Sequence, residues 1–410
     1  MQKESLINFN MIQDLGLPSS DNCCGCGACI DSCPVNALTF KEDEFGFIMP
    51  SVDSELCIKC KKCSKVCPSI NQQQLLTPIK VYAATSTDNE LSMKSSSGGI
   101  FATIAKHVLN QGGIVFGTAF DDEFNARVIA VEKLNDLHKL QGSKYVQSNM
   151  NGAYKKIEEE LKSDRPVLFC GTGCQVAGVR NYLKKDYDNL ILIDLVCHGV
   201  PNNKMFKDYI ALIEKKHKKK VVVYSFRDKQ QGQDEKGKII FDNGFEKKVP
   251  SYKSSYYGYF LDNTILRKSC HSCKYATQNR CGDLTLCDFW GAGEEIPQFV
   301  DHVSKQSLCG VSAIMVNNSK GSNIIDNLNC LLLMQEVEYM SVFKHNQNLL
   351  GPTKLTDERK TVLDNYAKND YSSIDKLYRR THGTKIFLKD IFNFLPKKLK
   401  SFIHKRRHKQ

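Results

Sequence analysis

The sequence lacks several features, and each absence excludes a class of protein. No run of eighteen apolar residues occurs in its 410 positions, so we expect no transmembrane helix. The opening stretch MQKESLINFNMIQDLG lacks the basic-then-apolar order of a secretory signal. We therefore expect a reducing, cytoplasmic setting in which disulfides are rare. The glycine fingerprint of dinucleotide-binding folds is also missing, because Val176 in GTGCQVAG replaces its third glycine.

Excess positive charge is small outside one end of the chain. The net charge is +12, but the last 26 residues, 385–410, carry nine Lys or Arg against one Asp and so hold +8 of it. The remainder is nearly neutral, which argues against a nucleic-acid-binding surface along the body of the protein. A hydrophobic content of 41% is ordinary for a globular chain, and the length suggests two or three domains.

Cysteine, in contrast, is abundant. Nine of the eighteen cysteines lie in two runs, CCGCGACIDSCP and CIKCKKCSKVCP, and each run reads C-x2-C-x2-C-x3-C-P. In the bacterial two-cluster pattern, three cysteines of a run bind one four-iron cluster and the cysteine before proline binds the other. The predicted ligands of the first cluster are Cys23, Cys26, Cys29 and Cys67, and those of the second are Cys57, Cys60, Cys63 and Cys33. Cys24 falls outside the spacing and is predicted to be a spare thiol.

Zinc and disulfides are the alternatives for these cysteines. Zinc sites usually show two separate Cys-x2-Cys pairs, and disulfides need an oxidising compartment, so two [4Fe–4S] clusters are the favoured interpretation. A further Cys-x2-Cys pair, Cys270 and Cys273 in SCHSCKY, supplies half of a third site. Cys174 and Cys197 could complete that site from distant loops, or several of these cysteines could be buried small hydrophobic residues.

The hydrophobic pattern after residue 75 alternates between strands and helices. We expect strands in KVYAAT, IVFGTAF, RVIAVEK, RPVLFCG and NLILIDLVCHG, and a strand pair in VVVYSFRD and KGKIIFDNG. This predicts an α+β (mixed α/β) fold with a mixed sheet. The expected segments are a lead-in at 1–20, a two-cluster ferredoxin-type domain at 21–72, a larger flavin and iron–sulfur domain at 78–345, a helical extension at 346–384 and a basic amphipathic tail at 385–410.

Two loops carry weaker signals. In SSSGG, Ser95, Ser96 and Ser97 are good helix N-caps, and Gly98 and Gly99 would let a ligand approach the backbone, although simple capping explains the same residues. GSKYVQS at residues 142–148 combines a cation, an aromatic ring and polar donors, which suits a planar electron-accepting ring but also an ordinary surface loop.

Five segments occur in an order that resembles the family of coenzyme F420 hydrogenase/dehydrogenase beta subunits. They are SSSGGIFATIAKHVL, GSKYVQS, FCGTGCQVAGVRNYL, LIDLVCHGVP and RKSCHSCKYATQNRCGDLTLCDFWG. The resemblance implies FAD beside a four-iron cluster whose ligands would be Cys174, Cys197, Cys270 and Cys273. It also implies flavin contacts from Ser96, Ser97, Gly98, Gly99, Ser143, Lys144, Tyr145 and Gln147. Cys281 and Cys287 stand where the family often has small residues, so the fourth ligand stays open.

The implied function is that of an oxidoreductase. Electrons would pass from a ferredoxin-like donor or partner redox subunit through the clusters to FAD, and on to a two-electron small-molecule acceptor. Lys144 could stabilise negative charge on the flavin, and His198 could move a proton or simply make a structural hydrogen bond. The alternative is a non-catalytic electron-transfer subunit. Family members do not share one substrate, so the resemblance does not identify the acceptor, nor whether it is coenzyme F420.

The C-terminal segment alternates apolar and basic residues from Lys385 onward. Such a segment can lie on an anionic membrane surface, which predicts a peripheral contact at the inner face of the membrane. Docking on a partner protein is the other interpretation. Pro396 is expected to interrupt any helix in this segment.

Overall fold

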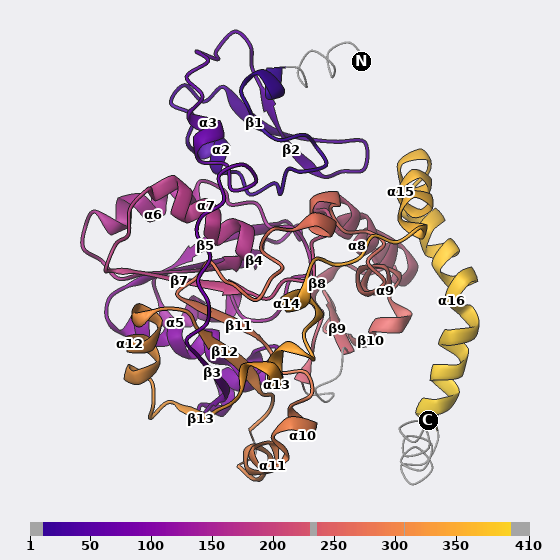
Figure 1. The fold of residues 1–410 in the computed structure, drawn as a ribbon. Coiled ribbons are helices and arrows are strands. Elements are labelled where there is room, and N and C mark those ends of the chain that lie inside the picture. The colour runs from indigo at the N-terminus through magenta and orange to yellow at the C-terminus, as the bar shows by residue number, and fades with distance from the viewer. Residues whose placement is uncertain (1–10, 230–235, 307, 395–410) are drawn as a thin grey trace.

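The computed structural model describes residues 11–229, 236–306 and 308–394, the side chains of 393 and 394 excepted. Its first part is a small module at one end of the molecule (Figure 1). Strands β1 (Leu38–Glu42) and β2 (Ile48–Val52) pair antiparallel, and short helices α2 (Ala28–Asp31) and α3 (Lys62–Lys65) follow the cysteine loops. Ile12, Leu15 and Leu17 of the lead-in pack against the cysteines of this module.

An eight-stranded mixed sheet forms the centre of the larger part. The strand order is β13-β3-β12-β11-β7-β6-β4-β5. Strands β4, β6, β7 and β11 run parallel to one another, whereas β5, β12, β3 and β13 add antiparallel pairs. The bounds are β3 (Lys80–Ser86), β4 (Ile114–Phe120), β5 (Ala126–Val131), β6 (Val167–Thr172), β7 (Leu190–Leu195), β11 (Leu284–Asp288), β12 (Ser312–Val316) and β13 (Leu332–Glu336).

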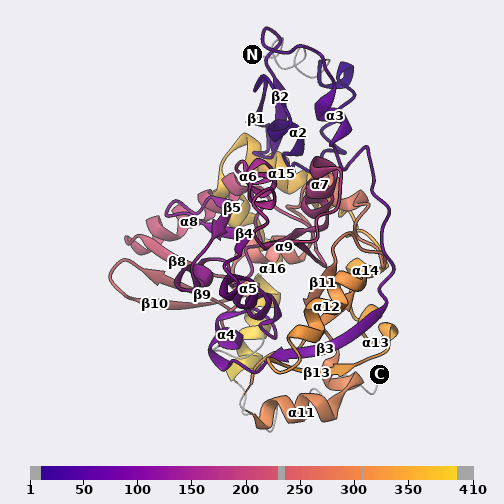
Figure 2. The same ribbon diagram turned by 90° about the vertical axis from the view of Figure 1, so that its left-hand side faces the viewer.

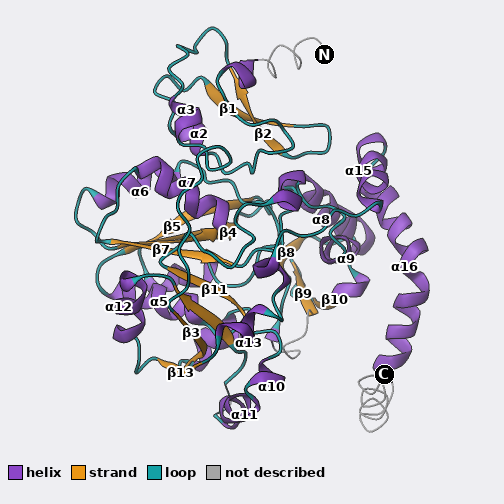
Figure 3. Cartoon of the chain, viewed as in Figure 1, coloured by secondary structure: helices purple, strands orange, loops and turns teal. Residues whose placement is uncertain are grey.

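Helices cover both faces of this sheet (Figure 3). Alternate residues of the central strands enter different clusters: Leu168 packs with α5 on one face, and Phe169 packs with α6 and α7 on the other. Burial on both faces explains why these strands read as continuous apolar runs in the sequence. The helices of the two faces are α4 (Asn89–Lys94), α5 (Ile100–Asn110), α6 (Ala153–Leu161), α7 (Gly173–Leu183) and α12 (Ser319–Asn327), with a 3-10 turn η1 (Leu134–Lys139).

A second, aromatic core lies beside the sheet. Phe206, Phe226, Tyr224, Tyr256 and Tyr257 are all buried there. They join a three-stranded sheet of β8 (Val221–Ser225), β9 (Lys236–Phe241) and β10 (Glu246–Pro250) to the helices α8 (Asn203–His217), α9 (Ser255–Leu261), α15 (Glu358–Lys368) and α16 (Tyr371–Phe394). Figure 2 shows this sheet projecting from one side of the body, with the small module and its helix α3 at the top.

The remaining short elements connect these cores. They are η3 (Ser251–Lys253), η4 (Lys268–Ser272), α10 (Ala292–Glu295), α11 (Pro297–Lys305), α13 (Tyr339–Phe343) and α14 (Gln347–Leu350). Helix α16 runs without a break across the expected boundary at residue 384, while Pro396 and the rest of the tail lie outside the described residues. Among the described helices, none is both long and apolar enough to cross a membrane.

The mixed α/β fold and the strands named from the sequence are confirmed, but the prediction of serine caps on α5 is wrong. The N-cap is Gly99, whose φ of 81° is left-handed, and no side chain caps the helix. The three serine hydroxyls bond elsewhere, because the chain turns sharply at Gly98 and Gly99 before the helix starts. Ser95 and Ser97 donate to the carbonyl oxygens of Leu91 and Val311.

Candidate redox site

A cavity of about 1030 Å³ opens at the carboxyl ends of the parallel strands. Residues 173–175 follow β6, residues 196–200 follow β7, and Cys287 and Asp288 end β11. The SSSGG loop and residues 142–148 complete the wall. Open α/β sheets bind ligands at this edge because the loops after neighbouring strands diverge there. The cavity is large enough for an extended cofactor.

The structure brings together the two cysteine sets that the sequence predicts in the small module. The thiol of Cys29 lies near those of Cys23 and Cys67, and Cys26 lies near Cys29 and Cys67. The second set lines a separate small cavity of about 20 Å³, together with Leu15 and Ile58. Its cysteines are Cys33, Cys57, Cys60 and Cys63. Four converging sulfurs in each set fit a cubane cluster.

The two sets differ in their exposure. Cys23, Cys26, Cys29 and Cys67 are all buried, whereas Cys60 of the second set is exposed. Backbone N–H groups also reach sulfur in both sets: Gly25 N lies 3.4 Å from Cys23 Sγ, and Ala37 N lies 3.2 Å from Cys33 Sγ. Such N–H···S hydrogen bonds stabilise negative charge on bound thiolates and so tune the cluster potential.

A third group of cysteines lines the large cavity. Cys174 is in the first turn of α7, Cys197 follows β7, Cys270 lies in η4 and Cys273 follows it directly. Cys273 lies near Cys174, Cys197 and Cys270, and Cys197 also lies near Cys270. The residues fit a third cluster, because four thiols from three loops converge on one side of a cavity with room for it.

Other cysteines that the sequence left open are placed differently. Cys281 is buried away from the cavity, and its thiol donates to Gly173 O at 3.2 Å and Asp194 Oδ2 at 3.4 Å. Cys287 lines the cavity, but its charged neighbours are Asp288, Arg280 and Asp194 rather than thiols. Both are therefore poorer candidate ligands than the four cysteines of the third group.

Cys24, expected to be a spare thiol, is not isolated. Its sulfur lies close to those of Cys174 and Cys26, and Ser69 Oγ donates to it at 3.6 Å. Hydrogen bonding from these groups holds the pKa of the Cys24 thiol well below its usual range. Cys24 thus lies between the first cysteine set and the third.

The small module is fixed to the larger domain through its first cysteine loop. Arg267 Nε donates to Cys23 O at 2.6 Å, and Ser269 Oγ donates to the same oxygen at 3.0 Å. Tyr154 donates its hydroxyl to Cys26 O at 3.0 Å. Buried polar groups must be paired, so these bonds make the orientation of the first cysteine set part of the folded core.

A buried ion pair supports the third group. Arg280 Nη2 lies 2.9 Å from Asp194 Oδ2, and both side chains are about 1% exposed. The same guanidinium donates to the carbonyl oxygens of Tyr275 at 3.0 Å and Leu195 at 3.1 Å. It therefore joins the segment after Cys273 to the end of β7, two residues before Cys197.

The two loops proposed to hold the flavin are joined by direct hydrogen bonds. The Ser143 N–H donates to Ser96 Oγ at 2.8 Å, and Ser143 Oγ lies 2.9 Å from the same oxygen. Ser97, Gly99 and Lys144 line the cavity beside them. The cavity lining also includes the rings of Phe101 and Trp290. Together with the serine hydroxyls, these rings fit a ligand that has both polar and planar parts.

Three residues of the predicted flavin set also have structural roles, and two of them, Tyr145 and Gln147, line the cavity as well. A Cβ on Gly98 would lie 2.5 Å from Ala84 O, so glycine is needed there for packing. The ring of Tyr145 stacks on Phe260 at 4.7 Å within the aromatic core. Gln147 donates to Cys24 O at 3.1 Å and accepts from Arg267 Nη1 at 2.9 Å, which places its amide at the junction of the two domains.

The two candidate catalytic side chains both line the cavity and both have partners. Lys144 Nζ donates to Lys139 O at 3.0 Å and Gln141 O at 2.7 Å, while burial lowers its pKa to about 7. His198 Nε2 lies 3.2 Å from Phe260 O, and burial lowers its pKa below the ordinary value. A neutral histidine bound to a backbone carbonyl fits a structural hydrogen bond.

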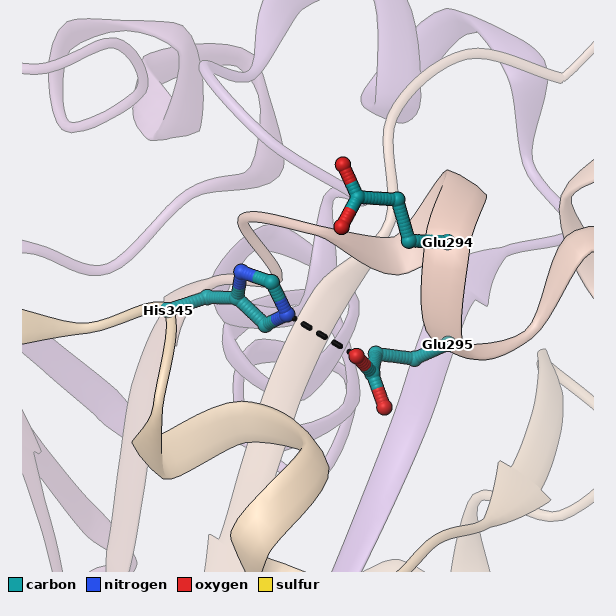
Figure 4. A group of neighbouring side chains, drawn as sticks. All are labelled: Glu294, Glu295 and His345. Atoms are coloured by element: carbon teal, nitrogen blue, oxygen red, sulfur yellow. Dashed lines mark hydrogen bonds and ion pairs between the residues drawn. The ribbon is translucent and has the colours of Figure 1, made fainter. Parts of the chain in front are cut away.

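A cluster of Glu294, Glu295 and His345 lies at the cavity edge, with His345 in its wall (Figure 4). The ligand atoms lie within 4.8 Å of one another, the spacing of a cation site. However, Glu295 Oε1 already accepts from His345 Nε2 at 3.0 Å and from Lys344 Nζ at 2.7 Å. The cluster is therefore a set of ion pairs that holds α10 against the segment of Lys344 and His345.

Comparison with known families identifies the two parts of the chain. Residues 22–71 match a 4Fe-4S dicluster domain. Residues 81–155 and 164–337 match the N-terminal and C-terminal models of coenzyme F420 hydrogenase/dehydrogenase, beta subunit, which together cover more than half of the chain. The chain belongs to this family. It carries the family's two domains behind an iron–sulfur dicluster domain, as the sequence predicted, and is an oxidoreductase-family protein.

Curated relatives match part of the chain. One subunit of the F(420)H(2) dehydrogenase of Methanosarcina mazei is 27% identical over 43% of this chain and 53% of its own length. Coenzyme F420-dependent sulfite reductase of Methanocaldococcus jannaschii is 29% identical over 47% of this chain and 29% of its own. The chain thus spans about half or less of these relatives. A chain of the F420-reducing [NiFe] hydrogenase complex from Methanosarcina barkeri aligns at 16% identity and a TM-score of 0.44, over 72% of this chain and 94% of its own.

Sequence reasoning missed the residues that join the domains. Arg267, Tyr154 and Ser269 hold the first cysteine loop through its backbone carbonyl oxygens. Arg280 does the same within the large domain, at Tyr275 O and Leu195 O. A pattern search could not find these contacts, because a carbonyl acceptor has no sequence signature. The one signal in the sequence is that Arg267 lies three residues before Cys270, which suggests a position near the cysteine loops.

Proposed function

We propose that this chain is an iron–sulfur flavoprotein oxidoreductase that passes electrons between a one-electron donor and a two-electron acceptor. Its two N-terminal clusters receive electrons from a ferredoxin-like donor or a partner redox subunit. The third cluster connects them to FAD in the large cavity, and the acceptor reacts there. The family membership and the dicluster domain support this assignment.

One observation carries the proposal: the first cysteine set is joined to the cavity. Cys24 and Cys26 line the same cavity as Cys174 and Cys273, and the thiol of Cys24 lies close to that of Cys174. The second set, with the exposed Cys60, lies at the far side of the module. The order of centres is therefore second set, first set, third group and cavity, which is an ordered path from solvent to a buried site.

The cavity residues have distinct roles in this proposal. A bound flavin exchanges one or two electrons, which is the chemistry needed between clusters and a hydride acceptor. Ser96 and Ser143 hold the two flavin loops together through their mutual hydrogen bonds. Lys144 places a cation in the wall and stabilises negative charge on the ligand. His198 orients its loop through its hydrogen bond to Phe260 O. It directly follows Cys197 in the sequence and could carry a proton there.

The alternative function is a non-catalytic electron-transfer subunit. Anaerobic isolation followed by an absorption spectrum, iron analysis and flavin extraction separates the two. Flavin bands with about eight to twelve iron atoms per chain are expected for the oxidoreductase, since each cubane holds four. Iron without flavin would support the relay role. Material that binds only zinc, or no metal, would contradict both.

The acceptor can then be sought with the reduced protein. The names of the two relatives make the deazaflavin coenzyme F420 the first candidate, because both proteins are named for reactions of that coenzyme. Anaerobic mixing of the reduced protein with oxidised F420, NAD and a benzoquinone would test three acceptor classes. Reoxidation of the flavin by one of them only would identify the class, and reoxidation by none would favour the relay role.

A further inference from the structure

The second cysteine set lies at an exposed face with an unusual charge pattern. Residues 21–72 carry seven acidic residues against five lysines, a net charge of −2. Four of those lysines nevertheless lie between positions 59 and 65, around Cys60. They are Lys59, Lys61, Lys62 and Lys65, and all four are exposed. The module is thus acidic overall, but basic where its outer cluster reaches solvent.

The same face has an apolar centre. Leu56 and Ile58 flank Cys57, and they are 52% and 62% exposed. Ile58, Lys61 and Lys62 also line the small cavity formed by the second cysteine set, so the face lies directly over that set. Exposed apolar residues ringed by charge are typical of interaction sites. We define the entry face as Leu56, Ile58, Lys59, Lys61, Lys62 and Lys65.

The backbone here supports a role for the lysine side chains. Lys59 and Lys61, on either side of Cys60, have left-handed φ angles of 53° and 57°. Glycine adopts this conformation without strain, whereas residues with a side chain adopt it less readily. Lysine at both positions therefore accepts strain that glycine would relieve, while it supplies charge beside the exposed cysteine.

The four lysines are also available for a partner. No residue that the structure describes forms an ion pair with any of them, although other exposed lysines of the chain do so, such as Lys268 with Asp21 at 2.6 Å. The negative groups nearest in sequence are Asp53 and Glu55. Asp53 Oδ1 is occupied by the backbone N–H groups of Glu55 at 2.9 Å and Leu56 at 3.3 Å.

The opposite side of the module is not accessible. The first cysteine set is covered by the large domain through Arg267 and Tyr154. Of the eight predicted ligands in the module, all of which the structure describes, Cys60 of the second set is the exposed one, and an external electron carrier would approach there. From this geometry we propose that the entry face docks an acidic one-electron carrier protein. This inference rests on the proposed function and adds the surface at which electrons enter. The attraction between a basic ring and an acidic partner accelerates association, and the small apolar centre suits a transient complex.

The experiment uses the full chain, purified anaerobically, and stopped-flow reduction by a reduced acidic two-cluster ferredoxin. The test variant is Lys59→Gln/Lys61→Gln/Lys62→Gln/Lys65→Gln. The matched control is Lys215→Gln/Lys216→Gln/Lys218→Gln/Lys220→Gln, which removes the same charge from exposed positions at the end of α8. Reduction by methyl viologen radical, a small cation that needs no docking face, measures whether the clusters are intact in every variant.

We expect the test variant to be reduced by ferredoxin roughly tenfold more slowly at low salt, and its rate to depend less on salt. The control variant should behave as the native chain. An unchanged rate in the test variant, or an equal loss in both variants, would overturn the proposal. So would a native chain that methyl viologen reduces but ferredoxin does not, whereas absence of iron or flavin would instead overturn the proposed function.

Other occupants of the face give different results. Retention of the native chain on vesicles containing anionic lipid, lost in the test variant but not in the control, would identify a membrane surface and contradict the carrier proposal. A dimer that dissociates only in the test variant would identify a second copy of the chain, with the same consequence for the carrier proposal.

Discussion

The guanidinium of Arg267 donates to the carbonyl oxygen of Cys23 at 2.6 Å, across 244 positions of sequence. The same side chain donates to Gln147 Oε1 at 2.9 Å and to Ile48 O at 2.8 Å, and is only 2% exposed. One arginine thus connects the first cysteine loop, a strand of the small module and the cavity wall. A planar fork with several donors can do this, and an ammonium group cannot.

We predict that Arg267→Lys loosens the small module. The change should lower the free energy of unfolding by about 2 kcal/mol or more, because buried acceptors at Cys23, Gln147 and Ile48 lose donors. Anaerobic urea denaturation of the iron-loaded protein measures this. The adjacent Lys268→Gln is the control, since its pair with Asp21 is exposed and worth little. Equal stability of the two variants would contradict the role assigned to Arg267.

Removal of a single thiol should abolish the third cluster and leave the other two, which the iron content per chain would show. We expect Cys273→Ser to lose about four iron atoms per chain while the signals of the two N-terminal clusters remain. Cys330→Ser, at an exposed position outside the cavity, should retain all the iron. Iron analysis and low-temperature EPR of the reduced proteins provide the measurement. Unchanged iron in Cys273→Ser would remove this cysteine from the ligand set.

The buried pair of Arg280 and Asp194 gives a stability prediction. Asp194→Asn should destabilise the fold by about 3–5 kcal/mol, because it leaves a buried guanidinium without its counter-charge. A double variant, Asp194→Leu/Arg280→Met, should be less destabilised than either single change. Denaturant titrations arranged as a double-mutant cycle measure the coupling. Additive effects of the two changes would show that the pair is not coupled.

The lowered pKa of Lys144 predicts that the stability of the fold depends on pH. Its folded pKa of about 7 lies below the ordinary value of 10.5, so between these values the unfolded chain binds more protons. Stability should therefore rise with pH from about 7 toward 10, and this part of the rise should disappear in Lys144→Met. Lys139→Met, at an exposed lysine paired with Asp136, is the control. A rise of equal slope in Lys144→Met would contradict the pKa shift.

Cysteine spacing was the most informative signal in the sequence for the candidate site. The two sets of four cysteines were named from the sequence alone, because a cubane needs thiolates at short, regular intervals and proline marks the end of each run. The parallel strands were equally visible, since burial on both faces makes them continuous apolar runs. Motifs also located the cavity loops, although the serines before α5 do not cap that helix.

Tertiary structure alone decided how these parts meet. That Cys24 lies close to Cys174, that Gln147 serves the domain junction, and that Cys60 is exposed all depend on how distant segments come together. Such contacts use backbone carbonyl oxygens and side chains that are common everywhere in proteins, so no local pattern marks them. Sequence thus determined which atoms could bind metal. The fold determined which cysteine set is enclosed and which is exposed, and this exposure underlies the proposed point of electron entry.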